Sequence, residues 1–379
     1  MLEEGGRRLR VLMLIDNLAG SGGGAERFVV ALAGELARNG LQVEVCVTRG
    51  AKPSVREALA SGGVPLMVLG RRGTLDLIPF GRLVRLMRRK KFDVLHAHMF
   101  GSSLWGVLLG KLGGVPVVIA HEHGTFPSGR LRRFLYREVV GRLATRYVAV
   151  SNFTREEMVK RHRVPRAQIE VIPAAYIPRE GPSATDLRHA LGIPRSAKLI
   201  GTIATLRRVK ALDVLVGAHA IVLEQHPDTH LVITGRGPSR RELERQVEAL
   251  GTSDRVHFLG HREEIGSILE ALDVGVLSSD SEGTPIFVME CIAYGVPVVS
   301  TDVGGLGDLV EPDATGVLVP PQDPPRLAAA IAELLDDPQR AKRLAAASGT
   351  RLPELTLPSV AMRFERLYAS AVAEAWRSG

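Results

Sequence analysis

The sequence has few cysteines and no long run of uncharged residues. Only Cys46 and Cys291 occur among 379 residues, which excludes a disulfide framework and indicates a reducing compartment. The longest stretch without Asp, Glu, Lys or Arg, residues 94–110, is shorter than the ~20 residues of a membrane-spanning helix. The apolar run at residues 11–15 is too short for a signal-peptide core. We therefore expect a cytoplasmic protein.

Aromatic residues are also scarce, at 4%, and the net charge of +8 is unevenly distributed. Residues 1–180 contain 29 Lys and Arg against 15 Asp and Glu, a net charge of +14, whereas residues 181–379 contain 20 against 26, a net charge of −6. A basic half suits an anionic lipid surface, an anionic small molecule or nucleic acid. Nucleic acid is the poorest of these partners because few aromatics are interleaved with the charges. A solvated arginine-rich surface explains the same asymmetry.

Short β-branched runs alternate with longer segments of helical period, and no short-period repeat interrupts them. This alternation predicts βαβ units and parallel sheets, and the length predicts two domains. The predicted strands are residues 10–15, 42–47, 65–68, 94–96, 116–119, 147–150, 169–172, 198–204, 230–234, 256–258, 274–278, 298–300 and 316–318. We expect two doubly wound α/β domains, each with a crevice at the carboxyl ends of its strands.

A proline-rich segment without strand character separates the two series. The predicted first domain covers residues 1–178, and a linker follows at 179–196. The second domain covers 197–356, and a final helix at 357–379 is expected to pack back on the first domain.

The most informative segment is SSDSEGTPIFVMECIAYGVPVVSTDVGG, residues 278–305. Glu282 and Glu290 lie eight positions apart, a spacing too common to identify a site by itself. Here, however, Glu282 lies in a loop between a strand and a helix that begins near Pro285, where proline suits the first turn. The free backbone N–H groups of that turn, on Ile286 and Phe287, form an anion site that the helix dipole supports. Glu290, inside the helix, can accept hydrogen bonds from a ribose diol.

This segment resembles the Glu-x7-Glu signature of glycosyltransferase family 4, a family of retaining transferases with the GT-B fold. The resemblance covers nearly the whole chain in the right order. The other matching segments are GSGGGAERFVVALAGELARNG, FDVLHAHMFGSSLWGVLLGKLGGVPVVIAHEHGT, AVSNFTREEM, IEVIPAAYI, GTIATLRRVKALDVLVGAHA and LVITGRGPSRRELE.

The resemblance implies two Rossmann-like domains that face each other across a cleft. It implies a retaining hexosyltransferase that moves a sugar from a nucleotide-sugar to a glycolipid, polysaccharide or lipid-linked acceptor in cell-envelope polysaccharide biosynthesis. A UDP-sugar is the favoured donor and GDP-mannose the alternative. No paired-aspartate motif for a metal is present, so we expect neither a metal nor a cofactor.

Four residues are expected to act on the reacting groups. Lys210 and Arg207 follow the first strand of the second domain and would neutralise the departing diphosphate. The resemblance places Glu282 and His123 beside the transferred sugar. The expected donor-binding residues are Gly23, Gly24, Gly235, Gly237, Gly283, Thr284, Ile286, Phe287 and Glu290.

Around Lys210 the chain departs from the family pattern at positions 205 and 211. Thr205 stands where an arginine is common, and Ala211 stands where a glycine commonly follows the lysine. Arg207 matches a variant form of the motif. The alternatives to a transferase are an epimerase or phosphorylase of the same fold, or a protein that binds a nucleotide-sugar without turnover.

The basic half contains two segments with a common pattern. Residues 129–143 place several arginines around an apolar helical stripe formed by Leu131, Phe134, Leu135, Val139 and Leu143. Residues 82–91 add six more positive charges. One hypothesis is that this face rests on an anionic membrane and collects a lipid-anchored acceptor. The alternative is that the stripe belongs to the core and the arginines are solvated.

Overall fold

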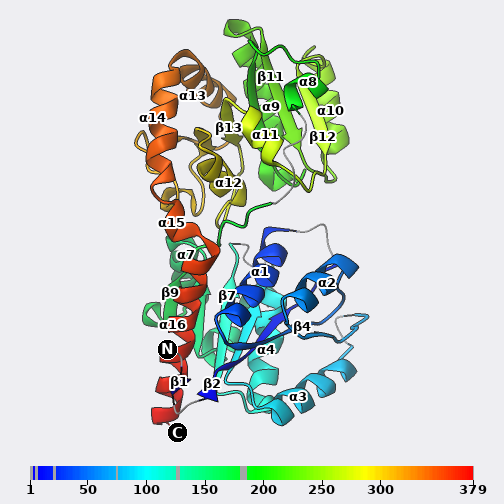
Figure 1. Ribbon diagram of the computed structural model, residues 1–379, viewed down its shortest axis with the longest axis vertical. Helices are drawn as coiled ribbons and strands as arrows, with labels where there is room; N and C mark the ends of the chain where they lie inside the picture. Colours follow the sequence, from blue (N-terminus) through cyan, green and yellow to red (C-terminus); the bar gives the residue numbers. More distant parts are fainter. Residues whose placement is uncertain are drawn as a thin grey trace. The chain divides into compact units, whose positions relative to one another are not determined.

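The structure is a computed structural model that describes residues 3–4, 7–19, 23–73, 76–124, 129–179 and 186–378. The chain divides into two compact units (Figure 1). Unit 1 consists of Met1–Ile177 and Thr356–Gly379, and unit 2 consists of Pro178–Leu355. The chain therefore leaves unit 1 once, builds unit 2 and then returns to unit 1.

Unit 1 contains a seven-stranded parallel sheet with the order β5-β4-β3-β6-β7-β8-β9. The order reverses between β3 and β6, so these two strands flank the crevice where ligands bind in doubly wound sheets. The strands are β3 (Arg10–Ile15), β4 (Gln42–Val47), β5 (Leu66–Val68), β6 (Val94–His98), β7 (Val117–Glu122), β8 (Arg146–Ala149) and β9 (Ile169–Val171). A separate antiparallel pair joins β1 (Glu3–Glu4) to β2 (Arg7–Arg8).

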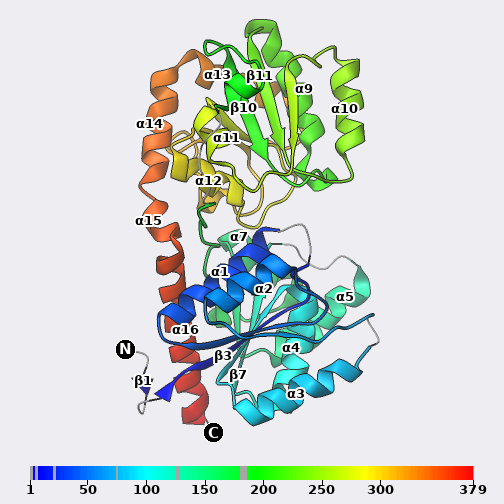
Figure 2. The same ribbon diagram turned by 45° about the vertical axis from the view of Figure 1, so that its right-hand side comes forward.

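Helices cover both faces of this sheet. They are α1 (Gly24–Arg38), α2 (Pro53–Ser61), α3 (Ile78–Lys90), α4 (Met99–Gly113), α5 (Arg130–Leu135), α6 (Gly141–Leu143), α7 (Asn152–His162) and α16 (Leu357–Ser378). Helix α16 contacts α1 and β7, and Figure 2 shows it running beside α1. Helix α4 contacts β7 and α3.

Unit 2 contains a six-stranded parallel sheet with the order β12-β11-β10-β13-β14-β15. The strands are β10 (Lys198–Ile203), β11 (Thr229–Thr234), β12 (Val256–Gly260), β13 (Val274–Leu277), β14 (Val298–Thr301) and β15 (Val317–Val319). The helices are α8 (Leu187–Ala190), α9 (Leu212–Gln225), α10 (Arg240–Ala249), α11 (Gly266–Ala271), α12 (Ile286–Tyr294), α13 (Pro324–Asp336), α14 (Pro338–Gly349) and α15 (Leu352–Leu355).

The sequence explains the two sheets directly. Central strands such as β3 (RVLMLI) are apolar at nearly every position and buried on both faces, as expected of a parallel sheet between helix layers. Several helices begin where a side chain accepts a backbone N–H, as Asp323 does for α13 and Asp337 for α14. The expectation of two α/β domains with parallel sheets is confirmed.

Three details differ from the sequence expectations. Strand β6 extends to His98 and β7 to Glu122, beyond the predicted ends at residues 96 and 119. His98 and His121 therefore lie within the strands, not after them. The predicted linker at 179–196 contains α8, which Arg188 ties to Asp273 of unit 2 at 2.8 Å; its residues 180–185 lie outside the described part of the chain. Pro285 caps α12 rather than standing in its first turn.

The basic segment 129–143 does not form one regular helix. Residues Tyr136–Val140 form a π-helical turn between α5 and α6. Because such a turn changes the angular spacing of side chains, the expected stripe is displaced. Tyr136 and Val140 are fully buried, whereas Leu131 and Phe134 are 70% and 53% exposed.

Candidate functional site

In unit 2, Glu282 lies in the loop between β13 and α12 and is held by two donors. Lys210 Nζ donates a hydrogen bond to Glu282 Oε1 at 2.5 Å, and Ser279 Oγ donates to the same oxygen at 2.6 Å. Glu282 is 8% exposed. The carboxylate is therefore fixed in orientation and paired with a cation before any ligand binds.

The loop that carries Lys210 is tied to the loop that carries Glu282. Ser278 Oγ donates to the Lys210 carbonyl at 3.0 Å, and the Asp280 N–H donates to the Val209 carbonyl at 2.9 Å. These bonds set the lysine beside the carboxylate. Arg207 lies at the start of the same turn but is exposed, and within the described residues its side chain forms no ion pair.

Ala211, directly after Lys210, has a left-handed backbone with φ of +42°. Glycine adopts this conformation without strain, and alanine adopts it at a cost of about 1 kcal/mol. The common glycine at this position of the family motif therefore has a conformational reason. Ala211 keeps this left-handed conformation, and its side chain is buried.

Glycines allow three loops to meet at the carboxyl end of this sheet. A Cβ on Gly235 would lie 1.8 Å from the Ala204 carbonyl oxygen, and one on Gly237 would lie 2.2 Å from that of Leu206. These two glycines were expected beside the nucleotide. In the structure their lack of a side chain lets the backbone of the loop that leads to Lys210 pack directly against them. Gly304 plays the same part for the other loop, since its Cβ would lie 1.9 Å from the Glu282 carbonyl oxygen.

The first turn of α12 begins at Ile286, and a short loop connects it to Glu282. Gly283 and Thr284 are partly exposed in the connecting loop. The first intrahelical bond runs from Met289 N to Pro285 O, so the N–H groups of Ile286 and Phe287 precede the helical ladder. This arrangement can receive an anion beside the Lys210 ammonium.

Glu290 is held by a residue that the sequence analysis missed. Its Oε1 lies 3.0 Å from a guanidinium nitrogen of Arg179, and the glutamate is 1% exposed. A ribose diol at Glu290 would therefore meet a preformed ion pair rather than a lone carboxylate. Arg179 lies in the proline-rich stretch interpreted as a linker, where no local pattern indicates a functional role.

In unit 1, Gly23 and Gly24 begin α1, and a Cβ on Gly23 would meet no atom within 4 Å. The structure therefore shows room at this helix terminus but no contact that requires glycine; residues 20–22 of the same loop lie outside the described part of the chain. His123 follows β7, and its Nε2 lies 3.2 Å from His98 Nδ1. Burial lowers the pKa of His123 to about 4, so its ring is neutral at pH 7.

Only one group of three or more metal-type side chains is found among the described residues. Nitrogen atoms of His96, His98 and His121 lie within 4.8 Å of one another in the interior of unit 1. Hydrogen bonds already use part of this set, since His96 Nε2 lies 3.1 Å from His121 Nδ1.

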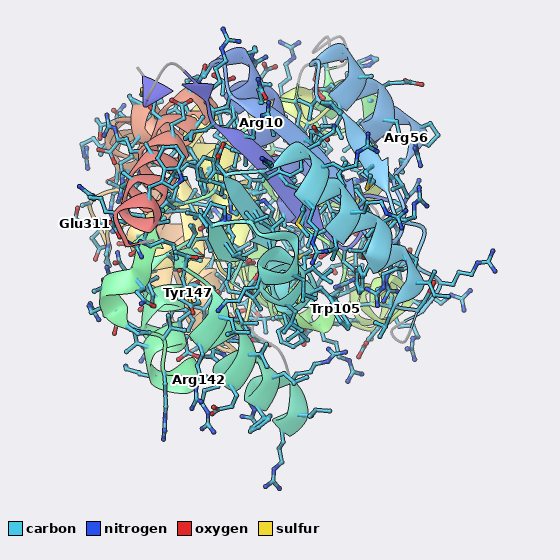
Figure 3. The ribbon with its side chains drawn as sticks, turned by 90° about the horizontal axis from the view of Figure 1, so that it is seen from below. Arg10, Arg56, Trp105, Arg142, Tyr147 and Glu311 are labelled. Carbon is cyan, nitrogen blue, oxygen red and sulfur yellow. The ribbon has the colours of Figure 1, made fainter. Side chains whose placement is uncertain are left out.

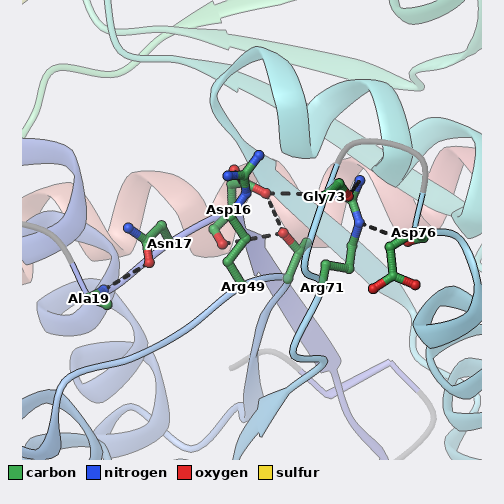
Figure 4. Close-up of polar contacts among 8 residues, drawn as sticks. Asp16, Asn17, Ala19, Arg49, Arg71, Gly73 and Asp76 are labelled. Carbon is green, nitrogen blue, oxygen red and sulfur yellow. Dashed lines mark hydrogen bonds and ion pairs between the residues drawn. The ribbon is translucent and has the colours of Figure 1, made fainter.

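A charged cluster at the carboxyl ends of β3, β4 and β5 was also missed (Figure 4). Asp16 Oδ2 lies 3.0 Å from Arg49 Nε, and Asp16 Oδ1 lies 3.9 Å from Arg71. The Arg71 guanidinium is buried over the Phe80 ring at 4.5 Å and donates to the Gly73 carbonyl at 3.1 Å. The signal is weak in the sequence because the residues follow three separate strands and share no motif.

Two sequence profiles match this chain. Glycosyltransferase Family 4 matches residues 22–176, and Glycosyl transferases group 1 matches residues 183–350. The D-inositol 3-phosphate glycosyltransferase of Corynebacterium diphtheriae is 30% identical over 389 residues, covering 93% of this chain and 91% of the relative. The enzyme of the same name from Corynebacterium urealyticum is 33% identical over 362 residues, covering 85% and 84%.

Solved structures show the same fold. HepE of Anabaena, crystallised with UDP and glucose, has a TM-score of 0.84 at 20% identity and covers 96% of this chain and 100% of its own. Sucrose-phosphate synthase of Thermosynechococcus elongatus has a TM-score of 0.79 at 22% identity and covers 97% and 100%. The GT-B fold expected from the motifs is confirmed.

Proposed function

The chain belongs to glycosyltransferase family 4 and is a glycosyltransferase, and from that premise we propose that it transfers a sugar from a UDP-sugar with retention of configuration and without a metal. The Lys210–Glu282 pair beside the first turn of α12 carries the proposal. An ammonium and a helix N-terminus offer positive charge to a diphosphate, as a metal ion does in other transferases. Family membership favours a transferase over the epimerase, phosphorylase and binding-protein alternatives.

The donor preference is supported by one structural relative. HepE, at 20% identity, binds UDP and UDP-glucose. In this chain the diphosphate would lie at Lys210 and the N–H groups of Ile286 and Phe287, and the ribose at Glu290. The Glu282 carboxylate would orient the hydroxyls of the transferred sugar, and the family resemblance assigns His123 a contact with the same sugar.

A thermal-shift panel with UDP-, GDP- and ADP-sugars tests the donor assignment. A ligand that binds only the folded state raises its stability by RT ln(1 + [L]/Kd), about 2.7 kcal/mol at one hundred times Kd. We expect a shift with the UDP-sugar that Lys210→Ala abolishes and that EDTA leaves unchanged. A shift that needs added manganese or magnesium would contradict the metal-free assignment, and a shift with GDP-mannose alone would change the donor.

Unit 1 is the expected acceptor domain, and the Asp16–Arg49–Arg71 cluster is the set of groups best placed to bind an acceptor there. It lies at the carboxyl end of the sheet, and its Asp16 follows β3, one of the two strands that flank the crevice. The relatives named as D-inositol 3-phosphate glycosyltransferases use a phosphorylated polyol by their name. A transfer assay should compare such a polyol phosphate with lipid-linked and glycan acceptors, using Arg49→Ala to test the cluster.

A membrane-bound acceptor is the alternative, and α5 supports it. Leu131 and Phe134 are exposed beside the exposed Arg130, Arg132 and Arg133, which suits the boundary of an anionic bilayer. Farther along the segment, Arg142 is 72% exposed and extends away from the ribbon (Figure 3). Among the described residues, no helix is both long and apolar enough to cross a bilayer.

Co-sedimentation with liposomes tests this surface. We expect binding to anionic but not neutral vesicles, weakened by salt and lost in a variant with Arg132→Glu and Arg133→Glu. The matched control is Arg241→Glu, an exposed arginine on α10 of unit 2. An absence of binding at every salt concentration would favour the soluble polyol phosphate.

A further inference from the structure

Four histidines gather on one face of the unit 1 sheet. His96 and His98 are two positions apart in β6, and His121 and His123 are two positions apart at the end of β7. Residues two positions apart share a face of the sheet, so all four side chains point to the same side. His96, His98 and His121 are fully buried. We call these four residues the histidine cluster. The proposed function uses only His123.

Tyr368 of the C-terminal helix α16 forms a hydrogen bond with this cluster. Tyr368 of α16 is fully buried, and its hydroxyl lies 2.7 Å from His96 Nδ1. His96 Nε2 in turn lies 3.1 Å from His121 Nδ1. Since Tyr368 and His96 are 272 positions apart, this contact exists only because the chain returns to unit 1 after building unit 2.

The ring of His121 packs against the ring of His123, so the orientation of one affects the other. The two rings stack with centroids 4.1 Å apart and planes inclined by 21°. His98 Nδ1 holds the other side of His123 through its Nε2 at 3.2 Å. His123 therefore has one ring face and one ring nitrogen fixed by the cluster, while its residue as a whole remains partly exposed.

Aromatic rings close the cluster on its helical side. Phe364 of α16 lies 5.2 Å from the His96 ring and 5.5 Å from the His121 ring, and Phe28 of α1 lies 5.8 Å from both His121 and His123. These rings exclude water, so a histidine that loses its partner inside the cluster has no solvent molecule to replace it. The hydrogen bond between the Tyr368 hydroxyl and His96 is therefore needed to keep the histidine rings in one arrangement of donors and acceptors.

We propose that Tyr368 is a positioning residue for His123, acting through His96 and His121. The proposal rests on the proposed function, in which His123 contacts the transferred sugar. Tyr368 itself touches no substrate. Without its hydroxyl, His96 can exchange the roles of its two nitrogens, His121 loses a fixed donor or acceptor, and the ring stacked on it becomes mobile.

The test compares two buried tyrosines of unit 1. Tyr368→Phe removes the hydroxyl at the cluster, whereas Tyr147→Phe removes a buried hydroxyl that donates to the Val140 carbonyl at 2.9 Å, away from the cluster. We expect Tyr368→Phe to lower kcat about five- to tenfold, as for one lost positioning hydrogen bond, with the donor KM unchanged. Ring nitrogen NMR signals of His96 and His123 should change in this variant. Tyr147→Phe should change neither.

A second variant guards against misfolding. His96→Asn breaks the same chain at its next link and should give the same loss of kcat and the same change at His123. The proposal is overturned if kcat and the His123 signals of both variants match the wild type. A stoichiometric metal ion in the purified protein also overturns it, because the cluster would then be a set of ligands. If the wild type transfers no sugar, the proposed function fails while the NMR comparison still decides the coupling.

Discussion

Replacing Glu122 with glutamine should stabilise the protein, and the gain should depend on pH. Glu122 is the last residue of β7 and points to the opposite face from His121, into the interior of unit 1. It is 1% exposed, and burial raises the pKa of its carboxyl from 4.5 to about 8, with the Tyr136 hydroxyl acting in the opposite direction. The folded protein therefore carries this side chain protonated at pH 7.

The size and sign follow from the two pKa values. Below pH 4.5 the carboxyl is protonated in both the folded and the unfolded protein, so it does not affect stability. Between pH 4.5 and 8 only the unfolded protein loses this proton, so stability is lost as the pH rises toward 8. Each pH unit between these values costs about 1.4 kcal/mol, which gives about 3 kcal/mol at pH 7. Glutamine is neutral throughout, so Glu122→Gln removes the penalty without changing the shape of the side chain.

Thermal and urea unfolding of both proteins from pH 4.5 to 8 measure the effect. We expect nearly equal stability at pH 4.5 and a higher melting temperature for Glu122→Gln at pH 8, by about 2–4 °C for each kcal/mol. The control is Glu170→Gln, which changes an exposed glutamate of β9 in the same sheet and should show no such trend. A difference that is constant with pH, or that favours the wild type at pH 8, would refute a neutral Glu122.

Three further predictions concern unit 2. Glu282→Gln and Lys210→Ala should each lower kcat/KM about 100-fold, on the order of 3 kcal/mol of transition-state stabilisation, while circular dichroism stays unchanged; near-normal rates in both would remove these residues from the reaction. Ala211→Gly should change the free energy of unfolding by less than about 1 kcal/mol, because relief of the left-handed strain offsets the greater freedom of glycine in the unfolded chain, and a loss above about 2 kcal/mol by urea titration would contradict that reading. Burial lowers the pKa of His219 to about 4, so stability is lost as the pH falls below 6.5; His219→Gln should therefore gain about 2 kcal/mol relative to the wild type at pH 5 and nothing at pH 8, as chemical denaturation at the two pH values will show.

The sequence predicts the strands well because each is a short apolar run with a clear boundary. Segments such as RVLMLI and QVEVCV are short apolar runs between helical segments, a pattern typical of buried strands. The structure has strands at both. The boundaries fail where polar residues continue a strand. His98 and Glu122 lie inside the sheet although neither residue type favours a buried strand. His98 contacts the other histidines of the cluster, and Glu122 interacts with Tyr136.

The candidate site was predictable only where its residues share a local motif. Glu282 and Lys210 lie in recognisable segments, and the structure brings them together; their roles in the reaction stay predictions. Arg179, Tyr368 and the Asp16–Arg49–Arg71 cluster carry no such signal. Their contacts depend on the path of the chain through space. The sequence predicts that the final helix packs on the first domain, but no local pattern shows that Tyr368 meets His96 or which strand ends come together.

The return of α16 to unit 1 fixes the order in which the two units can finish folding during synthesis. Unit 2 is one continuous segment, so it can complete its core before α16 leaves the ribosome. Unit 1 is synthesised first, but the face of β6 and β7 stays uncovered until α16, with Phe364 and Tyr368, has been synthesised. A nascent chain stopped after Leu355 would thus hold a finished second unit and an unfinished first one, exposing an aromatic and imidazole surface that chaperones and proteases can recognise.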